Sequence, residues 1–269
     1  MNLLLYHYKI RELGRTANKD CVFLNQKCIM KYMALLSYIS DEDIIKFTKE
    51  LVDASLHAQK STEKNPFKNV IDPFSALVDA ARQGISLDTW MQQEKSRQIQ
   101  KSFQNAVGNF HQHILGAVNN WIDAGEGGSY DVISDKKMII AEIKNKFNTM
   151  NSSSQLAAYD KLANWIDYDK HGYTAYIVDI IPKTPKPYCI PFTPSNRNIK
   201  RPSRNNLLRI DGRSFYALVT GKERAIDQLY AVLPQVLEII LKIDDTTLTN
   251  CSEFKQLFEK AYLNNHCVM

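Results

Sequence analysis

The sequence has little cysteine, and its arrangement does not indicate a site. The five cysteines are odd in number and include no C-x-x-C pair: Cys21, Cys28, Cys189, Cys251 and Cys267. We therefore expect neither a disulfide framework nor a cysteine-based zinc site. The cysteines are expected to be free thiols in a reducing compartment.

Long apolar runs are also missing. None approaches the roughly 20 residues that a membrane-spanning helix needs. The opening residues, MNLLLYHYKIRELGR, have a short apolar stretch without a preceding basic residue or a following small-residue cleavage site. We therefore expect no secretory signal and predict a soluble protein of the cytoplasm.

Two motifs that would indicate other enzyme classes are incomplete. His111 and His113 stand two apart in an expected helix, so their side chains diverge, and no cysteine pair accompanies them. His111 is expected to be packed or hydrogen-bonded rather than a zinc ligand. Gly221-Lys222 lacks the upstream glycine of a P-loop, so nucleotide hydrolysis is not expected.

The 269 residues are 44% apolar and 10% aromatic, which is enough for a folded core. The net charge of +5 permits a polyanionic partner without requiring one. Residues 1–32 mix charged and apolar residues without a clear period. They are interpreted either as a peripheral extension or as an ordinary N-terminal helix.

Periodicity and turn residues predict a mixed α/β protein with a small sheet. Strands are expected at 130–134, 137–146, 171–182 and about 214–220. Helices are expected at 40–58, 75–82, 86–118, 152–167, 222–241 (interrupted near Pro234) and 252–262. Ser40 and Ser86 are expected as N-caps of the first and third helices, and Gly84 is expected to end the second.

The stretch YDVISDKKMIIAEIKNK, from Tyr130 to Lys146, predicts a hairpin that gathers charged groups. Side chains alternate along a strand, so Glu142 and Lys144 project from one face. Asp131 lies on the adjacent strand near the same end. The hairpin is thus expected to bring two carboxylates and one ammonium together.

These groups suit metal-assisted hydrolysis of a phosphodiester. Two close carboxylates repel each other, and Mg²⁺ relieves this because it prefers oxygen ligands. Asp131 and Glu142 would bind the ion, with the main-chain carbonyl of Ile143. Lys144 would orient a water and stabilise charge on the phosphate. The alternative is a surface salt bridge, which the apolar run IIAEIK disfavours.

This stretch resembles the PD-(D/E)xK nuclease superfamily, with Asp131, Glu142 and Lys144 as its two acids and lysine and Tyr130 in place of the proline. Longer phrases resemble type II restriction endonucleases that cut GGNCC or close variants. They are NPFKNVIDPFSALVDA, QEKSRQIQKSFQNAVGNFHQHILG, IIAEIKNKFNT, YIVDIIPK and IDGRSFYALVTG. The resemblance implies a restriction-endonuclease-like α/β core, with a small mixed central sheet flanked by helices and a helical N-terminal part. Residues 33–269 would form a single endonuclease domain, and 1–32 an extension.

Residues 183–213 form a basic, proline-rich loop expected to contact DNA. Arginine and lysine neutralise phosphates, and arginine also pairs with guanine. The predicted DNA-binding residues are Arg197, Lys200, Arg201, Arg204, Arg209 and Arg213. The alternative is a solvated loop whose charge serves solubility. Asp211 is expected to cap or orient Arg209. Supporting roles toward the metal-bound water or DNA are considered for Gln104, Gln112 and Asn145, against plain surface positions.

The resulting prediction is a Mg²⁺-dependent type II restriction endonuclease that cleaves double-stranded DNA at a short, GC-rich, near-palindromic site. The resemblance implies in-line hydrolysis to 5′-phosphate and 3′-hydroxyl ends, in the bacterial cytoplasm, beside a companion DNA methyltransferase. A twofold site favours a homodimer. The alternatives are a structure-specific repair or recombination nuclease and a non-catalytic DNA-binding protein.

Overall fold

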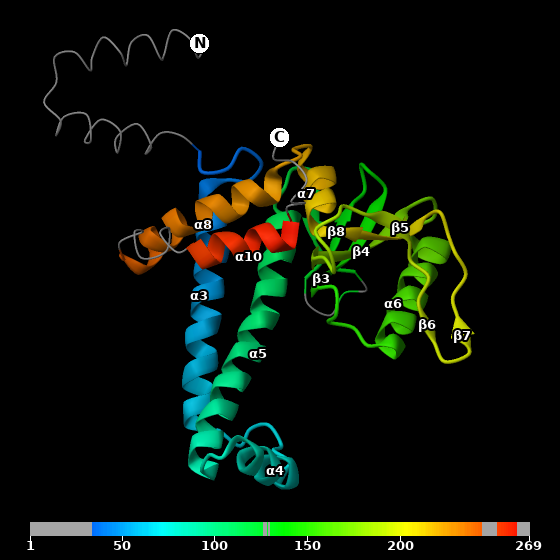
Figure 1. Cartoon of the computed structure of the whole chain (residues 1–269). Helices are drawn as coiled ribbons and strands as arrows, with labels where there is room; N and C mark the ends of the chain where they lie inside the picture. Colours follow the sequence, from blue (N-terminus) through cyan, green and yellow to red (C-terminus); the bar gives the residue numbers. More distant parts are fainter. Residues whose placement is uncertain (1–33, 126–127, 129, 244–251, 263–269) are drawn as a thin grey trace, which may run out of the picture. The chain divides into compact units, whose positions relative to one another are not determined.

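The computed structural model describes residues 34–125, 128, 130–243 and 252–262. Its helical N-terminal part comprises α3 (Asp41–Lys64), α4 (Pro73–Gln83) and α5 (Leu87–Gly116). The Ser40 and Ser86 hydroxyls accept hydrogen bonds from the first turns of α3 and α5, which confirms the two predicted N-caps. Helices α3 and α5 run side by side, and α4 packs on α5 at the end where α3 stops (Figure 1).

A six-stranded mixed sheet follows, in the order β1-β2-β3-β4-β8-β5. Its strands are β1 (Ile122–Asp123), β2 (Val132–Ser134), β3 (Ile139–Lys146), β4 (Thr174–Ile181), β5 (Cys189–Pro191) and β8 (Leu207–Asp211). Strands β3, β4 and β8 are parallel, whereas β1, β2 and β5 pair antiparallel. Strands β6 (Ser195–Asn196) and β7 (Ile199–Lys200) form a separate hairpin.

Each face of the sheet is covered by helices, which confirms the predicted α/β class. Helix α6 (Ser152–Asn164) links β3 to β4 and continues into the π-helical turn η1 (Trp165–Asp169). Its Tyr159 and Leu162 pack in one core with Ile140 and Ile177 of the sheet. On the opposite face, Tyr176 contacts Phe215 of α7 (Gly212–Thr220).

The strand predicted at about 214–220 was wrong, because these residues form helix α7. Asp211 caps the helix by accepting from the backbone N–H of Ser214, and Gly221 ends it in the left-handed conformation. Phe215, Tyr216 and Val219 are buried on one helical face, and this spacing also fits a short apolar strand. The strand of this region lies just before it, as β8.

The C-terminal part contains α8 (Ala225–Leu241) and α10 (Ser252–Tyr262). The predicted interruption near Pro234 was wrong, since α8 runs through it. A proline lacks the N–H donor and crowds the carbonyl four residues earlier, yet the residues on both sides of Pro234 stay helical. None of the helices in the described part of the chain is long and apolar enough to cross a membrane. The predicted boundary after residue 32 falls outside the described residues and stays a prediction.

Candidate active site

Glu142 lies on β3 between two lysines. Its side chain is buried, and the Lys144 ammonium donates to one carboxylate oxygen at 2.6 Å. Lys161 reaches the other oxygen from α6, at 2.7 Å. The two lysines lower the pKa of Glu142 against the opposing effect of burial. Glu142 therefore stays ionised, and both its oxygens have fixed partners.

Asp131 stands at the start of β2, against the edge of β3. Its backbone N–H donates to the Ala141 carbonyl at 2.9 Å, and its carboxylate accepts the backbone N–H of Ile143 at 2.5 Å. Burial and the nearby charge of Glu142 raise the pKa of Asp131 to about 6. The two carboxylates are thus close enough for each charge to affect the other.

The donor groups at this point fit a divalent cation. The ladder between β2 and β3 ends at the pair Val132–Ala141, so no β2 residue pairs with Ile143. In a strand, a residue's N–H and C=O point to the same side. The Ile143 carbonyl therefore points toward the side where Asp131 lies. Two carboxylates and one carbonyl are hard oxygen ligands of the kind that Mg²⁺ takes. Among the described residues, no group of three or more His, Cys, Asp or Glu side chains forms a metal cluster, so a site here would rely on this smaller set.

Comparison with known proteins identifies the family of the chain. The model of the Eco47II restriction endonuclease family matches residues 36–242. The type II restriction enzyme Eco47II from Escherichia coli is 43% identical over 216 residues, which cover 78% of this chain and 89% of that enzyme. The chain belongs to the Eco47II restriction endonuclease family. A more distant relative, the type II restriction enzyme Sau96I from Staphylococcus aureus, is 28% identical over 86% of this chain and 90% of its own. The predicted restriction-endonuclease family is thereby confirmed.

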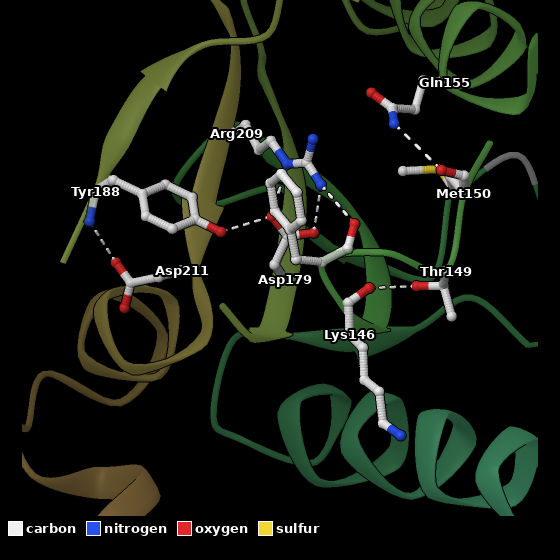
Figure 2. A network of polar contacts seen from close by, with 9 residues as sticks. Lys146, Thr149, Met150, Gln155, Asp179, Tyr188, Arg209 and Asp211 are labelled. Atoms are coloured by element: carbon white, nitrogen blue, oxygen red, sulfur yellow. Dashed lines mark hydrogen bonds and ion pairs between the residues drawn. The ribbon is translucent and has the colours of Figure 1, made fainter. Parts of the chain in front are cut away.

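A buried polar network adjoins the site in this family member (Figure 2). The Arg209 guanidinium donates to both oxygens of Asp179, at 2.6 and 2.9 Å, and to the Phe147 carbonyl at 3.0 Å. The Tyr188 hydroxyl donates to Asp179 at 2.6 Å. Because Asp179 pairs in register with Lys144, the network lies on the sheet face that carries Glu142 and Lys144.

The predicted DNA-binding residues fall into two groups. Arg197 and Lys200 lie exposed on the β6–β7 hairpin, with Arg197 in a left-handed turn conformation. The other four are paired with acids. Arg201 binds Asp160 through two bonds of 2.6 Å, Arg204 binds Asp167, Arg209 binds Asp179, and Arg213 binds Asp227. The arginines of the second group are thus partly neutralised in this structure.

The predicted supporting residues lie less directly at the site. Gln112 donates to Asp123 at 2.7 Å, and Asn145 donates to the main-chain carbonyl of Gln104 at 3.4 Å. His111 bonds the Tyr216 hydroxyl at 2.8 Å, which confirms its prediction as a hydrogen-bonded histidine.

Lys161 and Asp179 were missed by sequence reasoning. Lys161 is 19 residues from Glu142, and Asp179 is 30 from Arg209. The first contact depends on how α6 packs beside β3, and the second on how β4 pairs with β8. The one available signal was a charge within the apolar strand YIVDII, which is unusual without a partner.

Proposed function

We propose that this family member is a divalent-metal-dependent type II restriction endonuclease, which hydrolyses double-stranded DNA at a GGNCC-like site. The observation that carries the proposal is the Glu142 carboxylate, held between two lysines beside the half-buried Asp131. The names of its relatives, both type II restriction enzymes, support the same class of reaction.

Asp131, Glu142 and the Ile143 carbonyl would hold Mg²⁺, which supplies Lewis-acid chemistry and a more acidic water when bound. Asp131 is oriented for this by the N–H of Ile143, and Glu142 by its two lysines. The Lys144 ammonium would orient the attacking water and stabilise negative charge on the phosphate oxygens. In-line attack would leave a 5′-phosphate and a 3′-hydroxyl.

Lys161 has a positioning role in this proposal. It holds the Glu142 oxygen that Lys144 does not contact, so the carboxylate keeps one rotamer. A positive charge here also offsets the repulsion between the two acids. Helix α6 carries Lys161 next to Asp160, which binds Arg201 of the basic loop. The same helix therefore connects that loop with the catalytic carboxylate.

Arg197 and Lys200 are the proposed phosphate contacts, because both are exposed on the β6–β7 hairpin. DNA contact by Arg201 and Arg204 stays a prediction that competes with their aspartate partners. Arg209 is buried against Asp179, and Arg213 is half-buried against Asp227, which supports a bracing role for both arginines beneath the DNA-binding surface. A homodimer acting beside a companion methyltransferase completes the proposal.

The proposal is tested by incubating unmodified phage DNA with the protein and Mg²⁺, then sequencing the fragment ends. Discrete fragments that share a GGNCC-like end sequence are expected. Nicks that follow DNA structure would indicate a repair nuclease instead, and binding without cleavage in Mg²⁺ or Mn²⁺ would indicate a non-catalytic protein.

Lys144→Ala separates binding from chemistry. It is expected to abolish cleavage and to retain DNA binding in a mobility-shift assay. Lys170→Ala is the matched control, because Lys170 forms an ion pair with the exposed Asp135 at 3.2 Å. Normal cleavage by Lys144→Ala would show that the assignment of Lys144 is wrong.

A further inference from the structure

Helix α4 presents its large apolar side chains to solvent. Phe74, Leu77 and Val78 are 80%, 59% and 67% exposed, whereas Ala76 and Ala80 are buried. The exposed three are spaced i, i+3 and i+4, so they share one face of the helix. A surface helix ordinarily turns its large apolar face inward. Helix α4 does the reverse and packs through its alanines.

The exposed apolar surface continues on both sides of the helix. Phe67 and Val70 in the preceding segment are 70% and 101% exposed, and Leu87 at the start of α5 is 51% exposed. We call these six residues the α4 patch: Phe67, Val70, Phe74, Leu77, Val78 and Leu87. The two phenylalanines alone expose about 300 Å², at roughly 200 Å² for a whole aromatic side chain, and the four aliphatic side chains add to this area. The patch thus belongs among the largest apolar patches of monomeric proteins, ~300–600 Å², which are often functional.

The helix that carries the patch is firmly placed. Asp72 caps its N-terminus by accepting from the Phe74 N–H at 2.9 Å, and Gly84 ends it in the left-handed conformation. Asp79 accepts from the Trp90 indole of α5 at 3.0 Å and from Arg82 at 2.6 Å. Figure 1 shows α4 at the end of the α3–α5 pair. The apolar face is therefore displayed on a fixed support.

We propose that the α4 patch is the surface through which a second copy of this chain binds. The inference deepens the proposed function, in which two active sites serve a near-palindromic DNA site. An apolar patch of this size supplies much of the ~800 Å² per partner that a stable interface buries. The six patch side chains carry no charge, so two copies of the patch meet without like-charge repulsion.

A twofold axis fits the charges at the two ends of the helix. In an antiparallel pair of α4 helices, the Asp72 end of one helix lies beside the Arg82 end of the other. The opposed helix dipoles are favourable in the same arrangement. Such an interface is isologous, because the same patch serves both copies. The same arrangement buries the α4 patch of both copies at once.

The test is the mass of the full chain in solution by size-exclusion chromatography with light scattering. The wild type is expected at twice the chain mass of 30.9 kDa, and Phe74→Glu/Val78→Glu at 30.9 kDa. Ile239→Glu is the matched control, because Ile239 on α8 is 51% exposed and lies outside the patch. It is expected to remain dimeric. Circular dichroism of all three proteins checks that each is folded.

A monomeric wild type, or a folded double variant that stays dimeric, overturns the proposal. If the wild type is monomeric and deletion of residues 1–32 increases binding of an apolar dye, the N-terminal segment covers the patch instead. Failure of the proposed function is seen separately. A wild type that is dimeric through α4 but cleaves no DNA supports the interface and refutes the nuclease.

Discussion

Removing Arg209 tests how the buried network beside the active site contributes to stability. Arg209 and Asp179 have almost no exposed side-chain surface. Arg209→Met leaves the Asp179 carboxylate buried, with the Tyr188 hydroxyl as its remaining donor in the network. An unpaired buried charge of this kind costs about 3–5 kcal/mol. The guanidinium also stacks 4.0 Å from the Phe147 ring centre, and that contact is lost.

The double variant Asp179→Leu/Arg209→Met gives the decisive comparison. It removes both charges, so it leaves only the Tyr188 hydroxyl and the Phe147 carbonyl without partners, at about 1 kcal/mol each. We therefore expect the double variant to lose about 1–2 kcal/mol, less than Arg209→Met alone. Urea unfolding followed by circular dichroism measures all three free energies. The melting temperature of Arg209→Met should fall by roughly 10 °C.

Additive losses in the double variant would refute this reasoning, since they would show that the two charges do not depend on each other. The same proteins test the predicted DNA contact of Arg209. A stable double variant that binds DNA normally assigns Arg209 to bracing. A stable double variant that has lost DNA affinity assigns it to direct contact, as the sequence predicted.

Three further predictions concern single groups. Lys161→Ala should lower kcat at least tenfold, with little change in KM. Lys161→Arg should restore part of the lost kcat, because the positive charge beside Glu142 returns. Unchanged kcat in Lys161→Ala would exclude the positioning role. Burial lowers the pKa of His111 to about 4. Between pH 6.5 and 4 the unfolded chain therefore binds the extra proton, so stability falls with falling pH by about 3 kcal/mol relative to His111→Gln. Parallel pH curves of the two proteins in urea unfolding would contradict this. Arg197→Ala/Lys200→Ala removes two proposed phosphate contacts from each subunit of the homodimer, so it should reduce the slope of log affinity against log salt by roughly 4. An unchanged slope would show that neither residue contacts phosphate.

The sequence predicted what short-range rules determine. The hairpin around Glu142 follows from alternation, and the ends of α4 and α5 from Gly84 and Ser86. The strand prediction for the α7 segment was wrong because Phe215 and Tyr216 suit a buried strand as well as a helix. Here the Asp211 cap decided between them.

Long-range pairing was beyond sequence reasoning. Lys161 contacts Glu142 because α6 packs across β3, and no spacing in one sequence shows that distance. The basic loop was predicted as a set of available cations, yet Asp160 and Asp167 neutralise two of its arginines across 41 and 37 residues. Net charge in a segment does not reveal which charges are already paired.

The central claim is that the acids of β2 and β3 carry out metal-dependent cleavage. The most direct measurement compares the wild type with Glu142→Gln on unmodified phage DNA in Mg²⁺, followed by sequencing of the ends. We predict discrete fragments with one shared end sequence for the wild type, and for Glu142→Gln intact DNA that is still bound. Cleavage by Glu142→Gln at the wild-type rate would contradict the account.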